Sequence, residues 1–235
     1  MPATPVSPAY PPMKPDKSAF VELCLANEVL RFGRFTLKSG RVSPYFFDAG
    51  RFNHGRSLGQ LAGHYAGVLA ERIKRRFMLY GPAYKGIPLA AATAIKLSED
   101  HGLEVGCAFN RKEVKDHGEG GGLIGAPLSG NVVIIDDVIT AGTSVSQSVA
   151  TIKAAGATPH ALIIALDRRE TAGRRNLSAA QHMQRQYGIP VYSIIDLHDL
   201  IDYLENHGRA INRFGQFTAA LKSYRDQYGA PDRPE

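Results

Sequence analysis

Two adjacent carboxylates, Asp136 and Asp137, follow an unbroken apolar run at residues 132–135. Such a run is typical of a strand buried on both faces, as in a parallel sheet. A loop of small and hydroxyl-bearing residues, 140–144, comes next, and helical spacing of valines then begins. Backbone N–H groups at a helix start can hold a phosphate, and carboxylates can accept from vicinal hydroxyls or hold a hydrated divalent cation. The unit therefore predicts a site for a phosphorylated sugar.

The whole segment 131–149 resembles the phosphoribosyl pyrophosphate (PRPP) motif of type I phosphoribosyltransferases. Gly142 lets the backbone approach a ligand closely, and the hydroxyls of Thr143 and Ser144 can donate to it. The alternative is an ordinary strand–loop–helix unit whose acidic pair caps the helix, since Asp and Thr are common caps. The resemblance covers the complete unit, which favours the binding site.

Composition sets wider bounds. The chain has 235 residues, 44% of them hydrophobic and 21% charged, which fits one main globular domain at residues 16–235. A net charge of +6 suits nucleic acid and a polyanionic small molecule equally. Cys24 and Cys107 lack the CxxC spacing of a metal or redox site. We find no membrane-spanning stretch and no signal-peptide pattern, and therefore expect a cytoplasmic protein. The six prolines within residues 1–15 predict a mobile tail outside the fold.

Hydrophobic periodicity predicts the elements that position these groups. We expect helices at 18–31, 56–75, 87–100, from the 140–144 loop to 155, 197–206 and 209–227, and strands at 35–37, 45–47, 77–80, 103–110, 132–135, 161–166 and 191–195. The stretch 111–125 is polar and glycine-rich, without apolar periodicity. This alternation predicts an α/β fold with a doubly wound, mostly parallel sheet flanked by helices. Active sites in such sheets lie at the carboxyl ends of strands.

Several polar segments fall at those predicted ends, at 81–85, 110–111, 136–143 and 167–169. Lys85 and its neighbouring amides can clasp an anion, although a lone lysine in a turn is more often simply exposed. Arg168 can contact a carboxylate in a bidentate manner, or it can form an ordinary surface ion pair. Lys38 can face an anion while Phe46 and Phe47 flank a planar base, although such phenylalanines are more often core.

The loop 111–122 is charged and ends in glycines. Such a long loop in a compact domain is either functional or disordered. A mobile cationic lid can close over a polyphosphate and exclude water. The alternative is a solvated charged loop. The segment is not a P-loop, because it lacks GxxxxGK[ST] and does not lead from strand to helix.

Five stretches together carry a family resemblance: FTLKSGRVSPYFFDAG, GPAYKGIPLA, FNRKEVKDHGEGG, VVIIDDVITAGTS and LDRRE. Over about residues 20–228 the chain resembles the orotate phosphoribosyltransferases of bacteria and fungi. The resemblance implies a Mg²⁺-dependent reaction in which orotate and PRPP give orotidine 5′-monophosphate (OMP) and pyrophosphate, in de novo pyrimidine (UMP) synthesis. It also implies a core at about 56–206 beneath a small hood, formed mainly by 18–50 and the C-terminal helix.

The resemblance further implies the roles of individual residues. The ribose hydroxyls of PRPP would meet Asp136 and Asp137, and its 5′-phosphate the loop of Val138, Ile139, Thr140, Ala141, Gly142, Thr143 and Ser144. The pyrophosphate would be addressed by Tyr84, Lys85, Arg111, Lys112, Lys115 and His117, and Lys38 is a further predicted PRPP ligand. Orotate would be surrounded by Lys38, Phe46, Phe47, Thr140 and Arg168, with Arg168 on its carboxylate. The candidate catalytic residues are Lys115, Asp116 and His117.

The implied cofactor and partners follow from the same family. Mg²⁺ would arrive mainly through PRPP, with Asp136 and Asp137 holding it through water. The family works as a homodimer with shared active sites, so Arg111, Lys115 and His117 would act across the interface. We expect no nucleic acid and no membrane as partners.

Two other functions remain open at this point. The first is a phosphoribosyltransferase that uses a purine, which the segment from Lys38 to Phe47 argues against. The second is a regulatory relative that binds PRPP and nucleic acid without catalysis, which the basic charge permits. The retained loop at Lys115 to His117 and the lack of an added DNA-binding segment argue against it.

Overall fold

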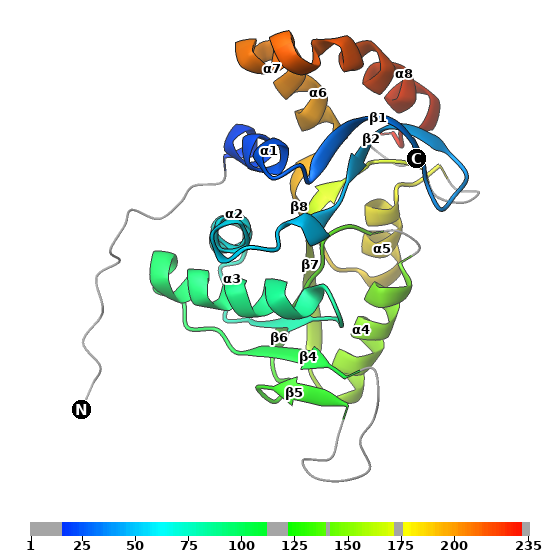
Figure 1. Ribbon diagram of the computed structural model, residues 1–235. Coiled ribbons are helices and arrows are strands. Elements are labelled where there is room, and N and C mark those ends of the chain that lie inside the picture. The colour runs from blue at the N-terminus through cyan, green and yellow to red at the C-terminus, as the bar shows by residue number, and fades with distance from the viewer. Residues whose placement is uncertain (1–15, 112–121, 140–141, 172–175, 232–235) are drawn as a thin grey trace.

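The computed structural model describes residues 16–111, 122–139, 142–171 and 176–231. Its centre is a six-stranded sheet in the order β5–β4–β3–β6–β7–β8 (Figure 1). The strands are β3 (Met78–Gly81), β4 (Cys107–Asn110), β5 (Leu123–Gly125), β6 (Asn131–Ile135), β7 (Thr158–Asp167) and β8 (Val191–Asp196). All neighbours pair in parallel except β5, which runs antiparallel to β4 at the edge. The expected α/β class and mostly parallel sheet are confirmed.

Two layers of helices explain why the strands are apolar without alternation. The helices α2 (Gly55–Arg72) and α3 (Gly86–His101) lie on one side of the sheet, and α4 (Thr143–Ala154) and α5 (Ala179–Tyr187) on the other (Figure 1). Val133 and Ile135 belong to the core on the α2 and α3 side, whereas Val132 and Ile134 belong to the core beneath α4. Successive side chains of one strand point to opposite faces, so both sets are buried.

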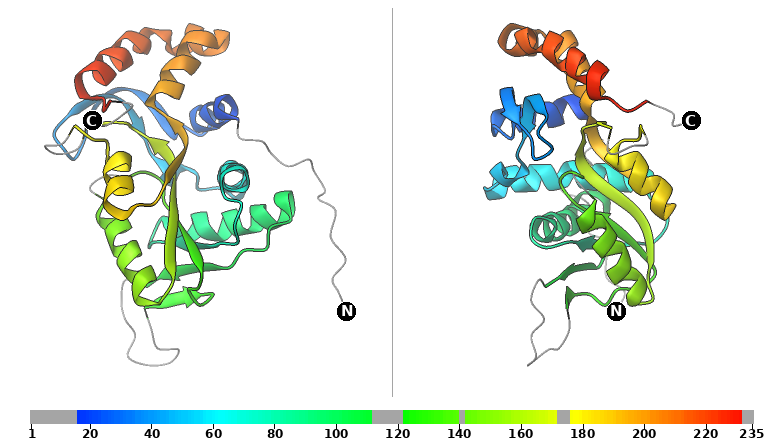
Figure 2. Two further views of the ribbon diagram at one scale, coloured as in Figure 1. Left: turned by 180° about the vertical axis from the view of Figure 1, so that it is seen from behind. Right: turned by 90° about the vertical axis from the view of Figure 1, so that its right-hand side faces the viewer.

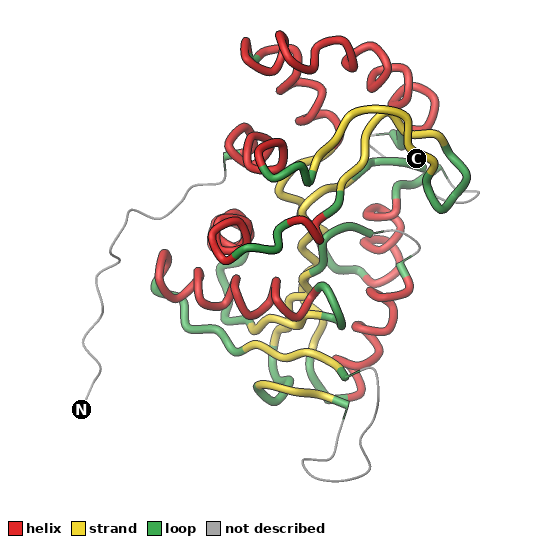
Figure 3. Tube along the Cα trace, viewed as in Figure 1, coloured by secondary structure: helices red, strands yellow, loops and turns green. Residues whose placement is uncertain are grey.

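A second group of elements gathers at one end of the sheet. It contains α1 (Lys17–Ala26), the antiparallel hairpin of β1 (Leu30–Thr36) and β2 (Val42–Phe47), α6 (Leu197–Asn206), α7 (Gly208–Phe214) and α8 (Thr218–Tyr228). All three views place the hairpin and α6 to α8 at this end (Figures 1 and 2). Contacts of α1 with α6 and of α8 with β2 hold the group together, and contacts of α1 and α6 with β8 join it to the sheet. The tube view shows the hairpin strands crossing above the sheet (Figure 3).

Short 3₁₀ turns and local caps account for the element boundaries. The turn η1 (Ala49–Arg51) follows β2, and η2 (Gly215–Phe217) separates α7 from α8. Ser178 and Gln181 form a capping box at α5, and Asp196 and Asp199 form another at α6. None of the helices in the described ranges combines the length and apolar character needed to cross a bilayer.

Several expected boundaries were wrong. The helix predicted at 18–31 ends at Ala26, because Glu28 takes a positive φ of 52° and the chain enters β1 at Leu30. The strand predicted from residue 103 begins only at Cys107. The stretch 111–125 contains the short strand β5, and α5 was not predicted at all. The single helix predicted at 209–227 is divided by η2.

Candidate active site

The acidic pair lies where β6 ends, beside the end of β7. The backbone N–H of Asp136 donates to the carbonyl of Ile163 at 3.0 Å, and the carbonyl of Asp137 accepts from the N–H of Ala165 at 2.9 Å. The phenol of Tyr65, on α2, donates to the carbonyl of Asp136 at 2.8 Å. These bonds fix the backbone, so the two carboxylates stand at the carboxyl end of the sheet, where the fold class predicts a site.

The two carboxylates have different surroundings. Asp136 Oδ1 accepts from the N–H of Asp137 at 2.9 Å, and its Oδ2 accepts from the Ser144 hydroxyl at 3.2 Å. Burial, and then the neighbouring charge of Asp137, raise the pKa of Asp136 to about 7. Asp137, which is only 5% exposed, instead has a cationic partner. The site therefore holds one carboxyl that changes charge near neutral pH.

The cationic partner of Asp137 is Lys85, whose Nζ lies 2.6 Å from Asp137 Oδ2. Burial lowers the pKa of Lys85, but the hydrogen bond and charge of Asp137 outweigh it and leave the pKa above its ordinary value. The turn from β3 into α3 brings Lys85 here, and it is very tight. A Cβ on Gly81 would lie 2.0 Å from the carbonyl oxygen of Gly86. Only glycine fits at this crossing, because the backbones of Gly81 and Gly86 pass too close for a side chain.

The first turn of α4 faces the acidic pair from the same loop. Gly142 has a φ of +75°, and a Cβ there would approach Met183 Cε to 2.8 Å. No side chain in the described ranges caps α4, which leaves first-turn amides for a ligand. Val138 and Ile139 are half-buried, Thr143 is exposed and Ser144 half-buried. Thr140 and Ala141 lie outside the described residues.

The neighbouring strand end carries the base of the charged loop. The N–H of Arg111 donates to the carbonyl of Gly122 at 2.7 Å, which closes the loop at its root. Asn110 Oδ1 accepts from the N–H of Ala83 at 2.8 Å and so ties this strand end to the turn of Lys85. Tyr84 is 67% exposed beside it. The predicted residues Lys112, Lys115, Asp116 and His117 lie outside the described residues.

The hairpin places its three predicted residues differently. Lys38 is exposed at the tip. The ring centroids of Phe46 and Phe35 are 5.5 Å apart. The Arg31 guanidinium lies 5.5 Å from the centroid of the Phe46 ring. Phe47 points to the opposite face of β2 and belongs to the core, with 9% exposure. The two phenylalanines therefore do not flank a common space with their rings.

Arg168 follows the end of β7 and reaches the hairpin. Its Nη2 donates to Ser43 Oγ at 3.0 Å, and its Cζ lies 4.2 Å from the centroid of the Tyr45 ring. It also forms an ion pair with Glu170. The sequence allowed for an ordinary surface ion pair at Arg168, but this pair is mostly buried. Burial disfavours the charged guanidinium, yet Tyr45 and Glu170 outweigh it and raise the pKa of Arg168. Arg168 thus joins the sheet to the hairpin.

Known proteins resemble the chain along nearly its whole length. An orotate phosphoribosyltransferase of Thioalkalivibrio sulfidiphilus is 52% identical over 217 residues, covering 92% of this chain and 100% of that protein. The enzyme of the same name from Bordetella pertussis is 56% identical over 218 residues, covering 89% and 95%. The chain belongs to the orotate phosphoribosyltransferase family. The crystal structure of the Francisella tularensis orotate phosphoribosyltransferase superposes with a TM-score of 0.79 at 37% identity, covering 90% of this chain and 99% of that one. No family model matches the chain.

Membership of the orotate phosphoribosyltransferase family confirms the predicted family and fold, and it disfavours the purine-using and regulatory alternatives. The structure brings Asp136, Asp137, Lys85 and Ser144 into direct contact. Arg168 and Phe46 lie at the hairpin instead. The roles assigned to these side chains from the resemblance remain predictions.

Sequence reasoning missed three groups in this orotate phosphoribosyltransferase site. Tyr65 supports the acidic pair from the middle of a helix, and Ser43 and Glu170 hold Arg168. Ser43 and Glu170 lie inside the stretches that carry the family resemblance, but only the folded chain brings residues 125 positions apart into contact. The sequence does not predict the role of Tyr65, because this residue occupies an ordinary apolar position of α2.

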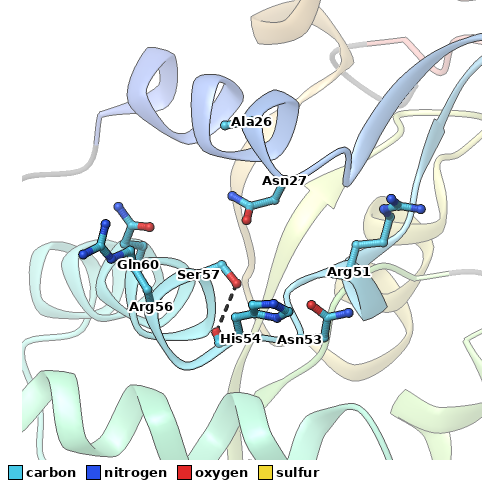
Figure 4. A pocket seen from close by; sticks show the side chains of 8 residues that line it. All are labelled: Ala26, Asn27, Arg51, Asn53, His54, Arg56, Ser57 and Gln60. Atoms are coloured by element: carbon cyan, nitrogen blue, oxygen red, sulfur yellow. Dashed lines mark hydrogen bonds between the residues drawn. The ribbon is translucent and has the colours of Figure 1, made fainter.

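Two further observations concern alternative sites. A pocket of about 550 Å³ between the end of α1, η1 and the start of α2 is lined by Ala26, Asn27, Arg51, Asn53, His54, Arg56, Ser57 and Gln60 (Figure 4). None of these is a predicted site residue of an orotate phosphoribosyltransferase. Within the part of the chain that the structure describes, no three His, Cys, Asp or Glu side chains group as a metal site.

Proposed function

We propose that this chain transfers the 5-phosphoribosyl group of PRPP to orotate, giving OMP and pyrophosphate in de novo pyrimidine synthesis. The observation that carries the proposal is the acidic pair of Asp136 and Asp137 at the strand end, facing the uncapped start of α4. The chain has this arrangement while being 52–56% identical to enzymes named for the reaction.

The proposed reaction separates charge in a way that these residues suit. Breaking the bond between ribose C1 and pyrophosphate builds positive charge on the sugar and negative charge on the leaving group. Asp136 and Asp137 accept from the ribose hydroxyls, and their negative charge favours the positive charge that develops on the sugar. Lys85, 2.6 Å from Asp137, places an ammonium at the same sugar-binding edge, ready for the departing oxygens. Amides at the start of α4 hold the 5′-phosphate.

Orotate itself needs little activation. It supplies an anionic ring nitrogen, so strong general-base chemistry is not required at the attack. Arg168 binds its carboxylate, and the hairpin residues Lys38 and Phe46 border its ring, whereas Phe47 supports the hairpin from the core. Lys115 and Asp116 handle charge or a proton at the leaving oxygens, with His117 beside them. Closure of their loop keeps water from the reactive sugar.

Mg²⁺ fits this site as a partner of PRPP and not as a resident of the protein. Asp137 Oδ2 is taken by Lys85, and among the residues that the structure describes no third carboxylate, His or Cys joins Asp136 and Asp137, so we expect most oxygen ligands to come from PRPP and water. When bound, the ion neutralises charge on the pyrophosphate. Asp136 and Asp137 would hold it through water.

The proposed assembly is a cytoplasmic homodimer in which Arg111, Lys115 and His117 serve the partner's site. Mixing tests the sharing directly. A Lys115→Ala chain and an Asp137→Asn chain, each almost inactive alone, should regain activity together, because each hybrid dimer contains one site with both wild-type residues. Mixtures that stay as inactive as the separate variants, after subunit exchange is shown with tagged chains, would contradict shared sites.

One assay tests the reaction and its base selectivity. Purified protein is mixed with PRPP, Mg²⁺ and orotate, and the loss of orotate absorbance is followed. Hypoxanthine, adenine and uracil replace orotate in parallel. Consumption of orotate alone, with pyrophosphate released in equal amount, supports the proposal. Faster turnover of a purine would overturn it.

A further inference from the structure

Glu170 is the residue through which the strand end, the hairpin and the C-terminal segment meet. Its side chain is 14% exposed and lies between two arginines. Glu170 Oε1 accepts from Arg168 Nε at 2.7 Å and lies 2.6 Å from Arg168 Nη2. Its other oxygen, Oε2, lies 3.5 Å from Nη1 of Arg41, at the start of the second hairpin strand. One carboxylate therefore pairs with two guanidinium groups.

The backbone of Glu170 is held as firmly as its side chain. Glu170 pairs with Gly229 in an isolated antiparallel bridge. On either side, the N–H of Ala230 donates to the carbonyl of Arg169 at 2.7 Å, and the N–H of Thr171 donates to Tyr228 at 2.8 Å. Gly229 admits no side chain, since a Cβ would lie 2.4 Å from the carbonyl of Arg225. This packing fixes the position from which Glu170 reaches Arg168.

The contacts of Arg168 are directional. Glu170 takes Nε and Nη2, Ser43 Oγ also takes Nη2, and the Tyr45 ring covers the guanidinium plane. Ser43 Oγ donates to the carbonyl of Tyr45 at 2.7 Å, so its lone pair is directed to Arg168. These bonds fix the rotation of the planar fork and none of them uses Nη1, while the Tyr224 phenol also interacts with this side chain. A guanidinium recognises a carboxylate through such fixed geometry.

We infer that Glu170 is a positioning residue for substrate recognition, which orients Arg168 toward the carboxylate that distinguishes orotate from uracil. The inference rests on the proposed function, because it takes Arg168 as the group that binds the orotate carboxylate. Glu170 itself does not touch the substrate. It supplies the countercharge that a mostly buried arginine requires and fixes the direction of its guanidinium fork.

A pair of nucleotides isolates this role. OMP carries the carboxylate, whereas UMP is the same nucleotide without it. Titration calorimetry of Glu170→Ala should show that OMP binds about tenfold more weakly than to wild type, which corresponds to the loss of about one charge-assisted hydrogen bond. The affinity for UMP should stay within about twofold of the wild-type value. Glu170→Gln keeps an acceptor oxygen for Arg168 but not the countercharge, and should recover OMP affinity only in part. In kinetics, the KM for orotate should rise in Glu170→Ala while the KM for PRPP does not.

Controls separate the possible failures. Glu205→Ala removes another glutamate ion pair, with Lys222, and should change neither nucleotide's affinity. Arg168→Ala should abolish the preference for OMP over UMP. If Arg168→Ala keeps the preference, the assignment of Arg168 is wrong. Failure of the proposed function is a separate result, in which the wild-type protein shows no activity with orotate. If Glu170→Ala does not fold, Glu170→Asp, which keeps the charge but withdraws it by one methylene, should show the same selective loss.

Three outcomes would overturn the inference while Arg168 keeps its role. Equal weakening of OMP and UMP would mean a general structural function for Glu170. Tighter OMP binding in Glu170→Ala would mean that Glu170 competes with the substrate. Unchanged binding of both nucleotides would mean that Ser43 and Tyr45 suffice to orient Arg168.

Discussion

Replacing Asp136 by Asn should stabilise the protein at pH 8. The pKa of Asp136 rises from its ordinary value of 3.8 to about 7, first through burial and then through the charge of Asp137. The folded state therefore binds this proton more tightly than the unfolded state does. The resulting stability is fully present below about pH 4 and is lost as the pH rises through about 7. Asparagine has no such proton, so the variant escapes the loss.

The pKa sets the size of the effect. Each pKa unit corresponds to about 1.4 kcal/mol, so the ionised side chain costs at most about 4 kcal/mol at pH 8. About 3 kcal/mol of that should disappear at pH 5, where the folded wild type is protonated. The amide fits the hydrogen bonds of Ser144 and the Asp137 N–H less well, which offsets part of the gain. We expect Asp136→Asn to be about 2 kcal/mol more stable than wild type at pH 8.

Urea denaturation at pH 5 and pH 8, at one protein concentration, measures this difference. Asp202→Asn on the exposed face of α6 serves as the control and should change stability little at either pH. Asp167, whose pKa is also raised by burial, is present in every variant and cancels from the comparison. A stability difference for Asp136→Asn that is absent at pH 8, or equal at both pH values, would refute the reasoning.

Three further predictions concern the loop, the turn and the metal. Lys115→Ala should lower kcat on the order of 100-fold with a smaller change in PRPP affinity, as single-turnover and binding measurements can show, and equal turnover with chemistry limiting both enzymes would contradict its role. Gly81→Ala should lower the free energy of unfolding in urea by about 3 kcal/mol, because its Cβ would lie 2.0 Å from the Gly86 carbonyl oxygen. Gly59→Ala is the control and should not lower it, because a Cβ there meets nothing within 4 Å. Chelation with EDTA should abolish turnover without changing the melting temperature of the substrate-free protein. A lowered melting temperature would instead indicate a resident structural metal.

The parts of the fold that follow one simple pattern could be predicted from the sequence. The run 132–135 is apolar at every position because two cores cover β6, and the acidic pair directly after it marks the strand end. The first turn of α4 follows from Gly142 and the hydroxyls after it. These local signals are strong because strand, loop and helix start are contiguous in the chain.

Other parts depend on contacts that no local pattern reports. The strand β5 has three residues and exists because β4 offers an open edge. The helix α5 is mostly polar and depends on its capping box and on a few buried side chains such as Met183. The role of Glu170 requires Arg41, Arg168 and Gly229 to meet, and these positions lie far apart in sequence. Phe46 and Phe47 are neighbours in sequence but point to opposite faces of a strand.

The most direct test of the account is a crystal structure of the protein with PRPP and Mg²⁺. The account predicts ribose hydroxyls on Asp136 and Asp137, the 5′-phosphate against the first-turn amides of α4, and Lys85 turned from Asp137 toward the pyrophosphate. PRPP bound at another surface, with the Lys85–Asp137 pair intact and the start of α4 unoccupied, would contradict it.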